Sequence, residues 1–103
     1  MELAVQIVRF VQDHQPPIVA CEFEDAEGKN HTLVDKVLIF TTEWLGQDSQ
    51  YPQAGGVGCE ILDQWQDASA RKLVRITIDK PDMVESTEGI SEFIVLSSQL
   101  RES

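Results

Sequence analysis

The feature that most constrains the fold is an alternation of apolar and polar residues with a period of two. In "IVACEFE", Val19, Cys21 and Phe23 point to one side, and the residues between them point to the other. Successive side chains of a strand lie on opposite faces, so this pattern is typical of a half-buried strand. The alternation recurs in residues 72–79, and residues 3–11 show it with both faces fairly apolar. The sequence therefore predicts a chain built mainly of strands.

Three further stretches are expected to be strands because apolar residues recur in them between turn signals: residues 31–40, 57–65 and 92–98. Glycine and polar residues in "DAEGKN" predict a hairpin turn, in which Gly28 supplies a positive φ. A second hairpin is expected across "QDASAR", and a further turn at Gly89.

The longest stretch with no strand pattern is residues 41–56. Thr41 or Thr42 could cap a single helical turn that ends at Gly46. The glycine-rich "AGGVG" lacks the lysine of a phosphate-binding loop, so a linker turn is expected there. The last residues, "QLRES", are expected to fray.

About six strands, many of them neighbours in sequence, predict an all-β, mainly antiparallel fold with at most one or two short helical turns. A chain of 103 residues has room for one core, so residues 1–103 are expected to form a single β domain. To protect both edges of its sheet, so short a chain must curl into a small barrel or a tight sandwich.

Charge is the strongest global signal. Eighteen acidic residues against eight basic ones give a net charge of −10. Such a field repels phosphate backbones and anionic lipid surfaces and attracts basic partners, so neither nucleic acid nor membrane is an expected partner. The acid excess is equally consistent with a domain that is merely kept soluble and monomeric.

A cytoplasmic location is expected by default. No apolar run approaches the roughly 20 residues that a membrane span needs. Glu2 stands where a signal peptide would carry positive charge, and Arg9 interrupts the apolar start. The two cysteines, Cys21 and Cys59, are too few for a disulfide scaffold, and both fall on the apolar side of their strands, where buried free thiols are expected.

Chemistry is most strongly suggested by "EFEDAEGKNHTL", which places four carboxylates and His31 around one glycine. The oxygens of Asp25, Glu27 and Asn30 are too closely spaced for a calcium loop, which favours a solvated hairpin tip. Cys21, Cys59 and the two histidines have no zinc-ligand spacing. No metal or other cofactor is expected, and the absence of a G-x-S-x-G motif makes an enzyme the less favoured class.

The leading functional hypothesis is a non-enzymatic module that binds a basic protein partner, such as an immunity- or inhibitor-type protein that neutralises a cationic toxin. Two acidic loops and two loop aromatics supply the candidate contacts, although the aromatics could instead plug the end of a barrel. These candidates are Glu24, Asp25, Glu27, Trp44, Tyr51, Asp82, Glu85 and Glu88.

Two alternatives remain. The first is a small-ligand-binding barrel or minor enzyme with its site under the loop of residues 41–56. The second is a homodimer formed through an exposed sheet edge.

Overall fold

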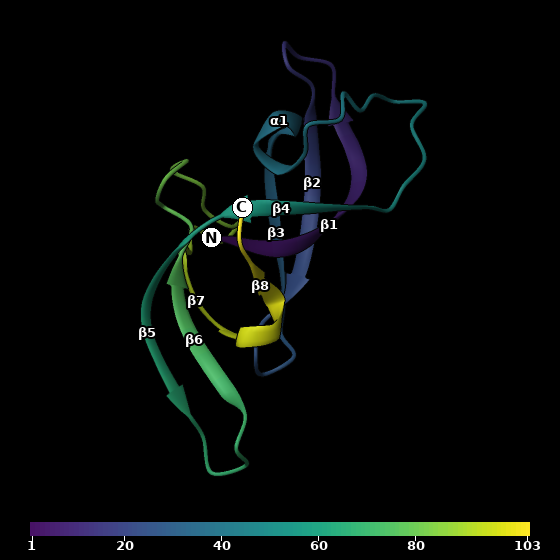
Figure 1. The fold of residues 1–103 in the computed structure, drawn as a ribbon. Helices are drawn as coiled ribbons and strands as arrows, with labels where there is room; N and C mark the ends of the chain where they lie inside the picture. Colours follow the sequence, from purple (N-terminus) through teal and green to yellow (C-terminus); the bar gives the residue numbers. More distant parts are fainter.

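The computed structural model describes residues 1–103 and confirms a mainly antiparallel β fold (Figure 1). Its strands form two sheets that pack in the manner of a sandwich and do not close into a barrel. No helix has the length and apolar character that crossing a membrane requires. The strands are β1 (Glu2–Gln12), β2 (Ile18–Glu24), β3 (Asn30–Lys36), β4 (Gln53–Gly58), β5 (Glu60–Gln66), β6 (Lys72–Thr77), β7 (Glu92–Leu96) and β8 (Leu100–Arg101), with a helical turn α1 (Val37–Phe40) and a 3-10 turn η1 (Ser97–Gln99).

The larger sheet is organised around β1. Its strand order is β3-β2-β1-β4, and β8 also pairs with β1. The alternate residues Leu3, Val5 and Ile7 of β1 are buried, as the period of two predicts. The register with β2 shifts between Ile7 and Arg9, which marks a bulge at that point.

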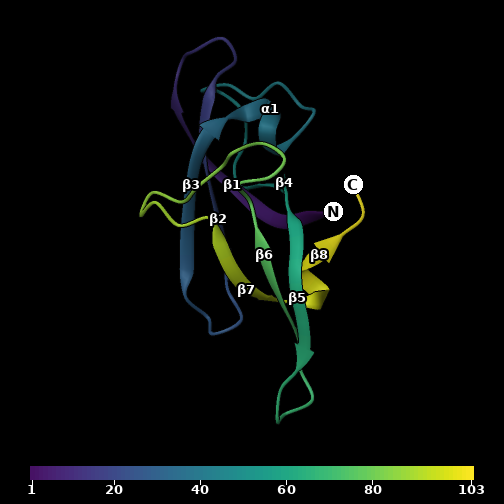
Figure 2. The same ribbon diagram turned by 90° about the vertical axis from the view of Figure 1, so that its left-hand side faces the viewer.

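The smaller sheet has the order β5-β6-β7. The chain passes into it from β4 through Cys59, whose backbone N–H donates to the carbonyl of Met1 (2.9 Å). In Figures 1 and 2 the hairpin formed by β5 and β6 extends away from the rest of the molecule. In this strand order, β5 is an edge strand of its sheet.

The two sheets share one hydrophobic core of 18 buried residues, drawn from both. Loops also connect the two sheets. The N–H of Ala26 donates to the carbonyl of Ile94 (2.9 Å), and the N–H of Thr87 donates to that of Thr32 (2.9 Å). These bonds bring the β2–β3 turn against β7 and the loop before β7 against β3.

Two expectations for residues 31–45 are wrong. The strand predicted over 31–40 ends at Lys36, α1 begins at Val37, and residues 43–45 form no helix. The apolar run "VLIF" fits helical spacing because Val37 and Phe40, three residues apart, are both buried. A short apolar run is compatible with either structure, and packing decides between them.

Two other expectations fail because strand pairing is longer than predicted. The stretch "AGGVG" lies in β4, paired with β1, and is not a linker turn. The C-terminal residues do not simply fray, since Leu100 and Arg101 pair with Leu3 and Glu2. These segments raise the number of strands from the expected six to eight.

The packing of β4 predicts a specific effect of adding one methyl group. A Cβ at Gly55 would lie 2.9 Å from both the Phe40 carbonyl oxygen and the Ile7 Cδ1, whereas a Cβ at Gly46 would meet nothing. We expect Gly55→Ala to lower the free energy of unfolding by about 1–3 kcal/mol, measured by urea denaturation. Gly46→Ala should change it by less than about 1 kcal/mol. Equal effects of the two substitutions would contradict this packing.

Candidate functional site

The candidate functional site is a pocket of about 390 Å³ at the junction of the two sheets. The turn between β2 and β3 forms one wall, and β6 and β7 form the other. We call it the Asp25–His31 pocket. Its lining combines carboxylates, cations and an apolar wall, and includes Asp25, Lys29, His31, Arg75, Glu92 and Ile94.

Asp25 builds the turn that forms this wall. Its Oδ1 accepts hydrogen bonds from the backbone N–H groups of Glu27 (2.9 Å) and Lys29 (3.0 Å). Gly28 adopts a φ of 81°, as expected for a glycine at a tight turn. The predicted hairpin tip is therefore confirmed, and one carboxylate oxygen of Asp25 is committed to the backbone of that tip.

The second oxygen of Asp25 holds His31. Its Oδ2 lies 2.8 Å from the Nε2 of the imidazole. Burial alone would raise the pKa of Asp25, but hydrogen bonds from His31, Lys29 and Glu27 outweigh it and hold that pKa below its ordinary value. An ionised carboxylate only accepts hydrogen bonds, so the Nε2 of His31 carries the hydrogen of this bond.

The imidazole of His31 is almost fully enclosed. Its exposed fraction is 4%, and its Nδ1 is buried without a hydrogen-bond partner. The ring packs against Phe23 and Phe93, at centroid distances of 5.2 and 4.7 Å. The buried imidazole, its aromatic neighbours and the partly exposed Asp25 thus form the inner side of the pocket.

Ion pairs neutralise most of the cations around the pocket. Arg75 lies 3.6 Å from Glu92, and Lys29 lies 3.9 Å from Glu88. Just outside the pocket, Arg71 pairs with Asp67 at 2.8 Å, and its hydrogen bonds hold the pKa of Asp67 below the ordinary value. The basic residues of β6 and its preceding turn therefore act mainly as partners for neighbouring acids.

The structure brings three of the predicted contact residues to this region. Asp25 and Glu27 line the pocket, and Glu88 approaches it through Lys29. These three acids already have a histidine or cation partner. The other predicted acids are exposed and have no basic group within ion-pair distance: Glu24, Asp82 and Glu85.

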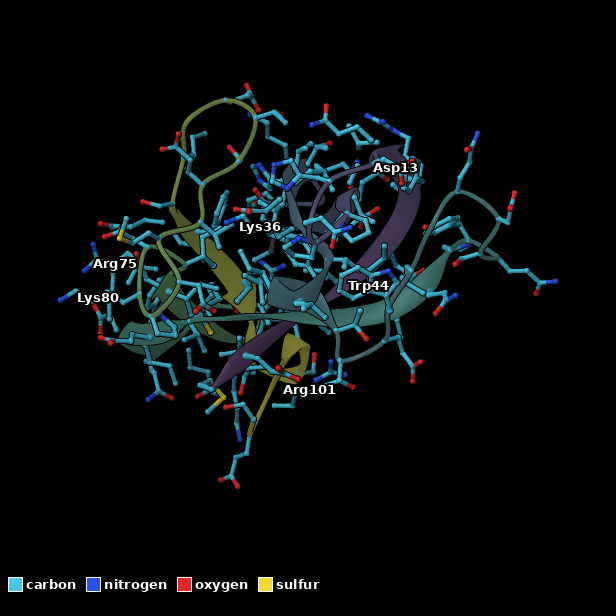
Figure 3. The ribbon with its side chains drawn as sticks, turned by 90° about the horizontal axis from the view of Figure 1, so that it is seen from above. Asp13, Lys36, Trp44, Arg75, Lys80 and Arg101 are labelled. Carbon is cyan, nitrogen blue, oxygen red and sulfur yellow. The ribbon has the colours of Figure 1, made fainter.

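The two predicted aromatic contacts lie elsewhere. Trp44 is 59% exposed and lies near α1, well away from Arg75 (Figure 3). Tyr51 packs against the core, and its hydroxyl donates to the carbonyl of Gly46 (2.8 Å). None of the five pockets is lined by either residue, so the ligand site expected under the loop of residues 41–56 has no cavity to support it.

Both cysteines are free and buried. Burial raises the pKa of Cys21 to about 12 and also raises that of Cys59. Thiols with raised pKa values carry little thiolate, so neither side chain is positioned to act as a nucleophile. No group of three or more His, Cys, Asp or Glu side chains has the geometry to hold a metal ion.

Sequence reasoning missed the side of the pocket built by β6 and β7. Arg75, Glu92 and Ile94 join the pocket only because of strand pairing, in which Arg75 lies opposite Ile94. The link between Asp25 and His31 had a local signal, because both flank one hairpin turn and His31 lies opposite the apolar Phe23.

Comparison with protein-family models, curated proteins and solved structures finds no match to this chain.

The lowered pKa of Asp25 predicts how stability depends on pH. A carboxyl group whose pKa is lower in the folded state than in the unfolded state stabilises the protein at pH values above its unfolded-state pKa. This stabilisation is lost as the pH falls through the folded-state pKa. At neutral pH, Asp25→Asn should reduce the free energy of unfolding by about 1–3 kcal/mol. The difference from the unsubstituted protein should shrink below about pH 4 in urea titrations.

Glu27→Gln is the matched control for this test. Glu27 is exposed and makes only a 3.8 Å contact with Arg71, so its substitution should change stability by less than about 0.5 kcal/mol at any pH. A destabilisation by Asp25→Asn that stays constant down to pH 2–3 would rule out the assigned role of the carboxylate charge.

Proposed function

We propose that this protein is a non-enzymatic interaction module that presents an acidic surface to a basic protein partner, as an immunity- or inhibitor-type protein would. The observation that carries the proposal is an excess of acidic side chains that the fold itself does not neutralise. The basic partner is identified here by its charge alone.

The ion pairs within the chain use few of its acids. Six of the eighteen acidic side chains lie within 4.0 Å of a basic group, which leaves twelve without such a partner. Paired charges cancel at short range, whereas charges without a partner contribute to the field around the molecule. The net charge of −10 is therefore carried largely by groups that are free to interact with another molecule.

Such a field favours fast association with a cationic surface. Long-range attraction raises the association rate of oppositely charged proteins, and added salt removes this increase within about a Debye length. Of the exposed acids, Glu24 ends β2 at the edge of one of the two loops proposed to face the partner, and Asp82 and Glu85 lie in the other. Apolar contacts would then supply the affinity that charge alone does not.

Partner capture followed by kinetics tests the proposal. Proteins retained from a cell extract on the immobilised chain at roughly 50 mM salt and released at roughly 500 mM salt are identified and purified. We expect the recovered partner to be basic, and its association rate in stopped-flow measurements to fall by about tenfold or more over that salt range. An acidic partner, or a rate that does not depend on salt, would contradict the proposal.

Matched double variants locate the surface. Glu24→Gln with Glu85→Gln removes two negative charges from the proposed loops, and Asp13→Asn with Asp48→Asn removes two exposed charges elsewhere. Both variants have the same net charge, so total charge cannot explain a difference between them. The first should slow association several-fold more than the second.

Binding of a small ligand is the second candidate function, and the Asp25–His31 pocket is the observation that favours it. Its volume of about 390 Å³ is within the range of known ligand sites. Its apolar wall lies beside the carboxylates of Asp25, Glu27 and Glu92. The cations of the pocket, Lys29 and Arg75, are already paired with acids, so the lining suits a small amine with an aliphatic or aromatic body.

A thermal-shift screen against such amines tests this second function. A ligand of the pocket should raise the melting temperature of the protein and of Ile61→Arg, an exposed position that lines none of the pockets. The same ligand should have no effect on Ile94→Arg, which places a large side chain in the pocket wall. If no compound in the screen raises the melting temperature in this pattern, the pocket does not bind this class of small molecule.

A further inference from the structure

The outer edge of β5 is the least protected part of the fold. β5 pairs only with β6, so the backbone groups on its other side have no strand partner. All seven residues from Glu60 to Gln66 are exposed. Figures 1 and 2 show this strand in the hairpin that extends from the body of the molecule. An open edge of this length is a ready template for another strand.

The side chains of β5 are unusually apolar for an exposed edge. Ile61, Leu62 and Trp65 are 37%, 43% and 38% exposed. The strand also carries two acids, Glu60 and Asp63, and neither has a cation within ion-pair distance. No lysine or arginine lies on the strand. The edge therefore offers apolar area and negative charge together.

Pairing with β6 sorts these side chains between the two faces of the sheet. Asp63 lies opposite the exposed Arg75, and Trp65 lies opposite Leu73, so the acid and the indole share the outer face. Ile61 lies opposite Ile76, which is fully buried, and thus shares the face that continues into the core. A register shift after Ile61 marks a bulge at Leu62.

We propose that β5 accepts, as a fourth strand of the smaller sheet, an extended segment of the partner in which lysine or arginine alternates with apolar residues. Backbone hydrogen bonds along the edge would supply affinity, and the two faces would supply specificity. Basic side chains would lie beside Asp63 and over the indole of Trp65, and apolar ones beside Ile61. This inference rests on the proposed function and specifies the surface and the chemistry of the partner.

Charge favours this occupant over a second copy of the chain. A two-fold axis through the middle of an antiparallel pair of β5 strands places the central residue opposite itself. For residues Glu60 to Gln66 that residue is Asp63, so two carboxylates would face each other without a cation between them. Like charges directly opposite each other destabilise a strand pair, and each copy also carries a net charge of −10.

A synthetic octapeptide of alternating lysine and valine tests the inference. Trp44→Phe leaves Trp65 as the sole tryptophan, so its fluorescence reports binding at the edge. We expect saturable binding that shifts the Trp65 emission and, in ¹H–¹⁵N spectra, perturbs the amides of residues 60–66. A peptide of the same composition with four lysines followed by four valines, and an alternating peptide methylated at every backbone nitrogen, should both bind at least about tenfold more weakly.

Two charge reversals provide the control within the protein. Asp63→Lys and Asp48→Lys change the net charge equally, at exposed positions, but only Asp63 lies on β5. Asp63→Lys should weaken peptide binding by about tenfold, and Asp48→Lys by less than about twofold at 150 mM salt.

The alternative outcomes are distinct. Equal binding of the methylated peptide, or perturbations confined to the loops of residues 24–27 and 82–88, would overturn strand addition while leaving an acidic interaction module in place. A dimer in sedimentation that Asp63→Asn strengthens would assign the edge to a second copy, because this substitution removes the repulsion between the two facing carboxylates. Failure of the proposed function itself is measured separately, by the salt dependence of association with the captured partner.

Discussion

The hydrogen bond from the Cys59 amide to the Met1 carbonyl holds the point at which the chain leaves the larger sheet for the smaller one. Side chains would obstruct this passage. A Cβ at Gly56 would lie 2.7 Å from the Glu2 carboxyl carbon, and one at Gly58 would lie 2.9 Å from Pro81 Cδ. The glycines of β4 therefore let its backbone run beneath the Glu2–Arg101 ion pair and the loop at Pro81. The chain then continues as β5, which has a neighbour on one side only.

The strands follow from local pattern wherever apolar and polar residues alternate in the sequence, and β2 has the predicted bounds of residues 18–24. Prediction fails where long-range contacts decide the structure. The backbone of β4 is a strand because β1 lies beside it, although three of its six residues are glycines, which lower its intrinsic strand preference. The two residues of β8 are too few to show a period. At α1, the partners available to Val37 and Phe40 select a helix.

The candidate site also has one part that the sequence predicts and one part that it does not. The turn of Asp25 and Gly28 could be predicted, because turn chemistry depends on residues a few positions apart. Its opposite wall could not, since Arg75 and Glu92 meet the turn only through the packing of two sheets whose order the sequence does not encode locally. Composition predicted the acid excess, but not which acids the fold engages. Asp25, among the candidate contacts, proves to hold a turn and a histidine.

The acids of β5 both protect the strand edge from self-pairing and favour one kind of partner. An apolar edge strand invites pairing with any exposed strand, and proteins commonly prevent this with charge or a bulge. β5 has both, in Asp63 and at Leu62. A carboxylate that repels an identical strand attracts one that carries a cation at the facing position, so a single side chain opposes self-association and favours a basic partner. The position of Asp63 on the face of Trp65 extends this preference to a second contact, because an indole also attracts a cation placed over its ring.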